Sequence, residues 1–124
     1  MTPYPLTVSP ARPRLDVAGI ALSLLCIVHC LAIPLLATGA LAWAASERVH
    51  LGLTIALCLV VVLAAVPGYR RHRRAVAPAL LALGLVLLVA AVGGAADETA
   101  LTVAGSGVLV AGHGLNLRLR PALA

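Results

Sequence analysis

Four long apolar runs constrain this chain more than any other feature of its sequence. They cover approximately residues 17–38, 49–66, 76–95 and 99–119, and each is bounded by charged residues, Pro or Gly. Each run is close to the ~20 residues with which an α-helix crosses the hydrocarbon layer of a membrane. The mean hydropathy of +1.09 agrees with this pattern. The sequence therefore predicts an all-α integral membrane protein, built as a bundle of four transmembrane helices.

The segments outside these runs are short. They comprise an N-terminal arm, residues 1–16, three tight loops, and a C-terminal tail, residues 120–124. Because none of them is long enough to fold as a separate domain, we expect the protein not to be an enzyme. The second run is followed by "PGYRRHRR". Pro67 and Gly68 are expected to end that helix, because neither residue favours a helix interior.

The distribution of arginine predicts the orientation of the chain. All nine basic residues are Arg, and eight of them belong to one side of the predicted bundle: Arg12, Arg14, Arg70, Arg71, Arg73, Arg74, Arg118 and Arg120. Basic residues near the ends of spans are retained in the cytoplasm. We therefore expect both termini to be cytoplasmic. The net charge of +5 reflects this topology, and no nucleic-acid partner is expected, because no stacking aromatic residues accompany the arginines.

The first run contains the sequence "CIVHC", in which two thiols and an imidazole interrupt apolar residues. Residues three and four apart lie on one face of a helix, so Cys26, His29 and Cys30 are expected to point the same way. Gly19 and Ser23 extend this face towards the N-terminus. Small and polar residues gain nothing from contact with lipid, so this face should look into the bundle.

Two other runs carry polar residues with helical spacing. Glu47 and His50 stand at i and i+3, a spacing with which a helix offers a carboxylate and an imidazole to one metal ion. They are equally compatible with a helix start after Ser46. His113 lies on the fourth run, where it is a further candidate ligand or a group that ties helices together. Gly107 and Ala111 on the same run form a pair of small residues that is expected to permit tight helix packing.

These side chains favour a metal ion as the ligand. Thiolate and imidazole suit soft or borderline ions, whereas Mg²⁺ and Ca²⁺ prefer oxygen ligands. A divalent ion that is bound by two thiolates is also neutral overall, which matters in a bilayer. The predicted metal ligands are Cys26, His29, Cys30, Glu47, His50 and His113. The alternative for the two cysteines is simple packing, since free Cys behaves as a small buried hydrophobic residue.

The chain resembles the MerC family of small inner-membrane mercury-resistance proteins. The resemblance rests on "LLCIVHC" followed by Pro34, on "ERVH", on "GYRRHRR" and on a fourth run that ends in "GHGLNLR". It covers nearly the whole chain. It implies a multi-pass protein of the bacterial inner membrane that moves Hg(II) inward, with Cys26 and Cys30 as the carriers of the ion.

The sequence leads to one principal expectation and two alternatives. We expect transport of a thiophilic ion by ligand exchange, with Hg²⁺ as the ion that the resemblance implies and no permanently bound cofactor. The first alternative is a non-transporting accessory or sensor protein, whose His, Cys and Glu residues bind Zn²⁺. The second is a membrane redox or haem protein. A bundle of four short helices is narrow, so a homodimer is compatible with this architecture.

Overall fold

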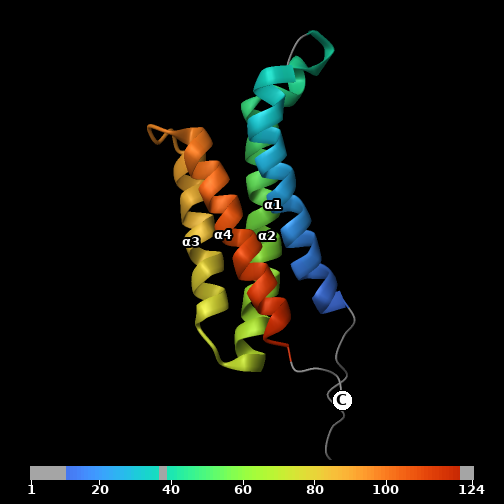
Figure 1. The fold of residues 1–124 in the computed structure, drawn as a ribbon, viewed down its shortest axis with the longest axis vertical. Coiled ribbons are helices and arrows are strands. Elements are labelled where there is room, and N and C mark those ends of the chain that lie inside the picture. Colours follow the sequence, from blue (N-terminus) through green and yellow to red (C-terminus); the bar gives the residue numbers. More distant parts are fainter. Residues whose placement is uncertain (1–10, 37–38, 121–124) are drawn as a thin grey trace, which may run out of the picture.

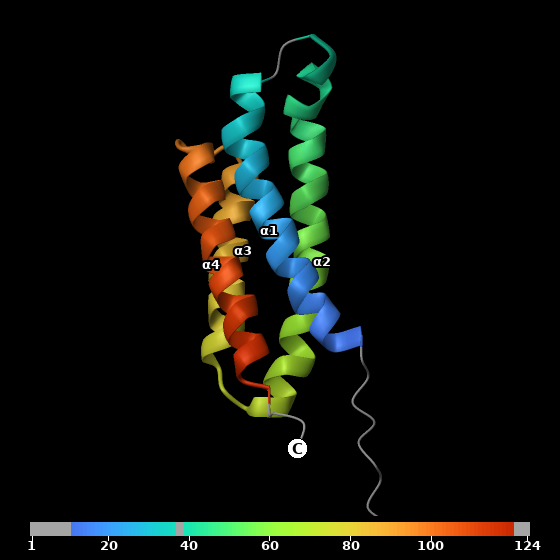
Figure 2. The same cartoon turned by 45° about the vertical axis from the view of Figure 1, so that its right-hand side comes forward.

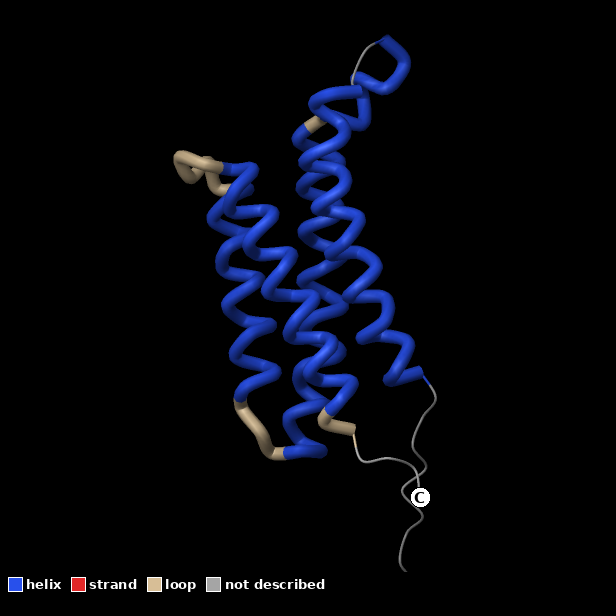
Figure 3. Tube along the Cα trace, viewed as in Figure 1, coloured by secondary structure: helices blue, strands red, loops and turns tan. Residues whose placement is uncertain are grey.

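The computed structural model describes residues 11–36 and 39–120, and the regular structure there is entirely helical (Figures 1 and 3). The elements are α1 (Ala11–Leu36), the 3-10 helix η1 (Gly39–Ala45), α2 (Glu47–His72), α3 (Val76–Val92) and α4 (Glu98–Arg118). By length and composition, α1, α2 and α4 can each cross a membrane, and α3 is an apolar helix of 17 residues. This confirms the all-helical fold and three helices that are long and apolar enough to cross a membrane. That all four helices cross the membrane stays a prediction.

The helices are bounded differently from the predicted runs. The expectation that Pro67 and Gly68 end the second helix is wrong, because α2 continues through both residues to His72. Proline in a helix removes one backbone hydrogen bond but does not forbid the turns that follow. The helix ends at Arg73, whose φ of 52° is left-handed and whose backbone N–H donates to the carbonyl oxygen of Tyr69. The third helix ends at Val92, earlier than predicted, because Gly93 and Gly94 follow.

The helices form an antiparallel up-and-down bundle (Figures 1 and 2). α4 packs against α3 and α1, and α2 packs against α1 and α3, whereas the backbones of α2 and α4 approach each other at few points. The start of α1, the α2–α3 loop and the end of α4 lie at one end, which we call the arginine-rich end. At the opposite end, called the acidic end because it carries Glu47, Asp97 and Glu98, α1 and α2 extend beyond α3 and α4 (Figure 2).

Glycines bring α3 and α4 together. A Cβ atom on Gly84 would lie 2.9 Å from the carbonyl oxygen of Gly105, and one on Gly105 would lie 3.0 Å from that of Gly84. The expectation that Gly107 and Ala111 form the tight contact is wrong, because both residues are exposed. The helices meet at the face of α4 that carries Gly105, which is nearly opposite to the face of Gly107 because the two residues are two positions apart.

Candidate metal-binding site

Four of the six predicted metal ligands line one cavity at the acidic end. Its volume is about 220 Å³, and its walls come from the end of α1, the start of α2 and the start of α4. The predicted ligands in its wall are His29, Cys30, Glu47 and His50. The rest of the wall includes Pro34, Glu98 and Thr99. The structure thus places imidazole, thiol and carboxylate groups from three helices, the residue types that bind soft and borderline metal ions, around one cavity.

His29 is oriented by the backbone of η1. Its Nε2 atom lies 2.6 Å from the carbonyl oxygen of Ala44. A carbonyl oxygen only accepts hydrogen bonds, so Nε2 carries the proton and donates it. The Nδ1 atom of His29 is buried and has no hydrogen-bond partner. In the neutral ring this nitrogen holds a lone pair, which is the form in which imidazole binds a metal ion.

His50 is oriented by two residues of α4. Its Nδ1 atom lies 3.1 Å from a carboxylate oxygen of Glu98, and its Nε2 atom lies 3.4 Å from the hydroxyl of Thr102. Because an ionised carboxylate only accepts, Nδ1–H donates to Glu98. The rings of His29 and His50 stand 6.2 Å apart between centroids. Each imidazole therefore has an acceptor that fixes its orientation, as metal-binding histidines in proteins do.

The three cysteines are free thiols in different surroundings. Cys30 is partly exposed and lines the cavity, whereas Cys26 is completely buried in the apolar core one turn further in. Cys58 is partly buried on α2. In the part of the chain that the structure describes, no three His, Cys, Asp or Glu side chains are close enough to hold a metal ion together. The six residues accordingly stay predicted ligands, and the cavity gathers most of them without arranging them as a closed coordination shell.

His113 lies apart from this cavity, near the arginine-rich end. Its Nδ1–H donates to a carboxylate oxygen of Asp16 at 3.0 Å, and both side chains are fully buried. Its ring packs against Gly19, where a Cβ atom would come within 2.2 Å of the Nε2 atom. Gly19 precedes Cys26 by seven residues, or about 10 Å of helix. His113 therefore does not share a site with the thiols in this arrangement.

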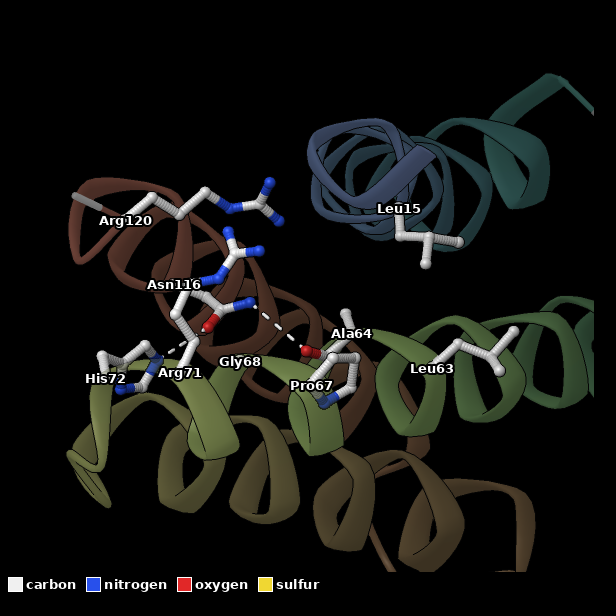
Figure 4. Close-up of a pocket in the computed structure, with 9 residues that line it drawn as sticks. All are labelled: Leu15, Leu63, Ala64, Pro67, Gly68, Arg71, His72, Asn116 and Arg120. Atoms are coloured by element: carbon white, nitrogen blue, oxygen red, sulfur yellow. Dashed lines mark hydrogen bonds between the residues drawn. The ribbon is translucent and has the colours of Figure 1, made fainter. Parts of the chain in front are cut away.

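Asp16 is the centre of a polar network that joins α1 to α4 and α2. Its carboxylate also accepts hydrogen bonds from the Asn116 amide, at 2.9 and 3.0 Å, and from the Arg120 guanidinium, with which it forms an ion pair. Figure 4 shows Asn116 and Arg120 at the adjoining crevice, where the Asn116 oxygen bonds to His72, at 3.0 Å. The network satisfies a buried charge, which in lipid is essential for stability.

Sequence reasoning missed two acidic residues of these clusters. The sequence places Asp16 in the N-terminal arm, but α1 begins at Ala11 and carries Asp16 inside the bundle. Its spacing of three residues from Gly19 on the polar face of α1 is the signal that could have revealed it. Glu98 precedes the fourth predicted run, which begins at residue 99, but it is the first residue of α4. Its position four residues before Thr102 places both on the face that meets His50.

Comparison with known proteins identifies one family. A family model described as "MerC mercury resistance protein" matches residues 16–118 of the chain. No curated protein and no solved structure matches it. The matched segment includes Asp16, both cavity histidines, all three cysteines and His113.

Proposed function

Because the chain belongs to the MerC mercury resistance family, we propose that it carries Hg(II) across the bacterial inner membrane, with Cys30 and Cys26 as the successive sulfur ligands. Membership makes the protein a mercury-resistance membrane protein. The direction of transport, the ligands and their order belong to the proposal. The arginines support an orientation in which the acidic end, with its cavity, faces the periplasm.

The observation that carries the proposal is the placement of the two thiols. Cys30 lines the cavity, and Cys26 lies one helical turn further from it, completely buried. An ion that enters from the acidic end meets Cys30 first. His29 stands beside Cys30 in the cavity wall with an unpartnered Nδ1 atom. This arrangement supports capture at the cavity followed by transfer into the core.

The transfer proceeds by ligand exchange. Hg(II) arrives with chloride or thiolate ligands, and one of these leaves with the proton of Cys30 as a mercury–sulfur bond forms. Cys26 then gives its proton to the second departing ligand as it binds the ion. In the resulting complex a dication is bound by two thiolates and is neutral, so no bare charge enters the low-dielectric interior. Metal binding therefore releases one proton for each thiol that becomes a ligand.

The test is mercury binding by a protein that lacks the two thiols. Serine preserves the approximate size and polarity of cysteine but does not bind mercury as sulfur does. Purified wild-type protein should retain about one mercury per chain after desalting, measured by elemental mass spectrometry. Cys26→Ser together with Cys30→Ser should reduce retention at least tenfold, while expression and membrane insertion remain normal.

Cys58→Ser is the matched control, because this third thiol lies outside the cavity wall. It should retain as much mercury as the wild type. Equal retention by the double variant would overturn the role of the thiols, and loss in Cys58→Ser alone would place the site on α2.

A second candidate function is binding of a borderline ion such as Zn²⁺ without transport. The hydrogen bonds that orient His29 and His50 favour it, because such partners are typical of zinc-binding histidines. In that case zinc should be retained by the Cys26 and Cys30 double variant and lost from His50→Gln. The same mass spectrometry, with zinc in place of mercury, separates the two functions.

A further inference from the structure

Among the residues that the structure describes, three hydroxyl groups inside the bundle have no hydrogen-bond partner. They belong to Ser23 on α1, Thr54 on α2 and Ser106 on α4, and all three side chains are at least nine-tenths buried. Serine and threonine in membrane helices ordinarily bond to a carbonyl oxygen of the preceding turn. These three do not. A buried hydroxyl without a partner lowers stability, so packing alone does not account for their presence.

Contacts between α1 and α4 place Ser106 opposite Cys26. The two helices are antiparallel, and Gly19 of α1 contacts His113 of α4. Seven residues further along α1 lies Cys26, and seven residues back along α4 lies Ser106. One turn beyond, Cys30 lies beside Thr102 in the same register. Cys26 and Ser106 are both fully buried, as residues on the facing surfaces of the two helices should be.

Contacts between α2 and α4 place Thr54 in the same layer. These helices run in the same direction, and His50 bonds to Thr102 while the Ala64 carbonyl accepts from Asn116. Both pairs are separated by 52 residues in the sequence. Thr54 and Ser106 have the same separation and lie between them. Leu57 and Leu109, one turn further along each helix, belong with Cys26 to one apolar cluster.

Ser23 adds a hydroxyl from α1 itself, one turn closer to the arginine-rich end and at the level of Leu109. It precedes Cys26 by three residues, so both side chains lie on one face of the helix. Hydroxyls of all three long helices therefore lie within one helical turn of the level of the buried thiol, and none of the three is hydrogen-bonded to it in this structure. A neutral thiol packs well among apolar side chains and needs no hydroxyl groups near it. Hydroxyl groups near the sulfur therefore fit a thiolate, whose negative charge they can stabilise.

We propose that Ser23, Thr54 and Ser106 are positioning residues that donate hydrogen bonds to the Cys26 sulfur when it is a mercury-bound thiolate. The layer is a binding station for a soft cation in the interior of the bundle. Hydrogen bonds to a thiolate stabilise its charge, and the low dielectric of the interior strengthens them. This inference rests on the proposed function, because it concerns the second of the two thiols through which the ion passes.

The test removes two hydroxyls and keeps the shape of the core. Thr54→Val with Ser106→Ala should leave thermal stability in detergent equal to that of the wild type or higher, because neither hydroxyl has a partner to lose. Uptake of mercury into proteoliposomes should fall at least tenfold. The matched control is Thr54→Ser with Ser106 unchanged, because this variant keeps both hydroxyl groups. It should retain most of the wild-type uptake.

A spectroscopic measurement distinguishes this role from a structural one. Hydrogen bonds to a thiolate move the ultraviolet charge-transfer band of its mercury complex to shorter wavelength, so the band of the Thr54→Val and Ser106→Ala variant should move to longer wavelength. Uptake within twofold of the wild type and an unchanged band would overturn the inference and leave the proposed function intact. Absence of uptake by the wild type itself would overturn both.

Discussion

The contact between Gly19 and His113 shows at the scale of single residues how α1 and α4 are held together. The imidazole lies where a side chain at position 19 would be, and its Nδ1–H is bonded to Asp16. His113 ties two helices together, which is one of the two roles that the sequence leaves open for it. The sequence could not show what His113 contacts, because the partner, Asp16, lies 97 residues away.

Replacing Gly19 by alanine should therefore destabilise the protein. The new methyl group would overlap the ring of His113, and overpacking of this kind costs about 1–3 kcal/mol. Gly52→Ala is the matched control, because it also lies within a helix and a Cβ atom there meets nothing within 4 Å. Thermal unfolding in detergent should show a lower midpoint for Gly19→Ala only. Equal midpoints for both variants would contradict the observed packing of His113.

At the scale of helices, apolar runs predicted the elements well and their contacts poorly. Each predicted run corresponds to a helix, since a run of this length in lipid has few alternatives. Which face of α4 meets α3 depends on packing between two helices that are both largely apolar. Gly105 and Gly107 look equivalent in the sequence, but only Gly105 contacts Gly84.

Gly84→Ala should separate α3 from α4. Its methyl group would approach the backbone oxygen of Gly105, which cannot rotate away as a side chain can. We expect a loss of about 1–3 kcal/mol in the free energy of unfolding. Gly107→Ala, with open space around the site, should be neutral or slightly stabilising, because alanine favours helix over glycine by up to ~1 kcal/mol. Unfolding by a denaturing detergent measures the free energy of unfolding of both variants. A larger decrease for Gly107→Ala than for Gly84→Ala would show that the face of Gly107 is the packed one.

For the whole molecule, the structure has a cavity at the acidic end and a bonded network at the arginine-rich end. The cavity gathers His29, Cys30, Glu47 and His50, which are four of the six predicted ligands. The Asp16 network joins α1, α2 and α4 at the opposite end through Asn116 and its partners. An open cavity at one end and a closed, hydrogen-bonded end opposite it are compatible with a carrier whose ion enters from the acidic end. The cytoplasmic location of the termini and the homodimer stay predictions.

The most direct test of the central claim is mercury uptake by purified protein in liposomes. Mercury is offered outside as its charged bis-glutathione complex, which does not cross lipid by itself, and a thiol indicator is enclosed inside. Wild-type protein should deliver mercury to the indicator well above the rate of empty liposomes, and Cys26→Ser with Cys30→Ser should fall to that background. Equal rates for the wild type and the double variant would contradict thiol-mediated transport.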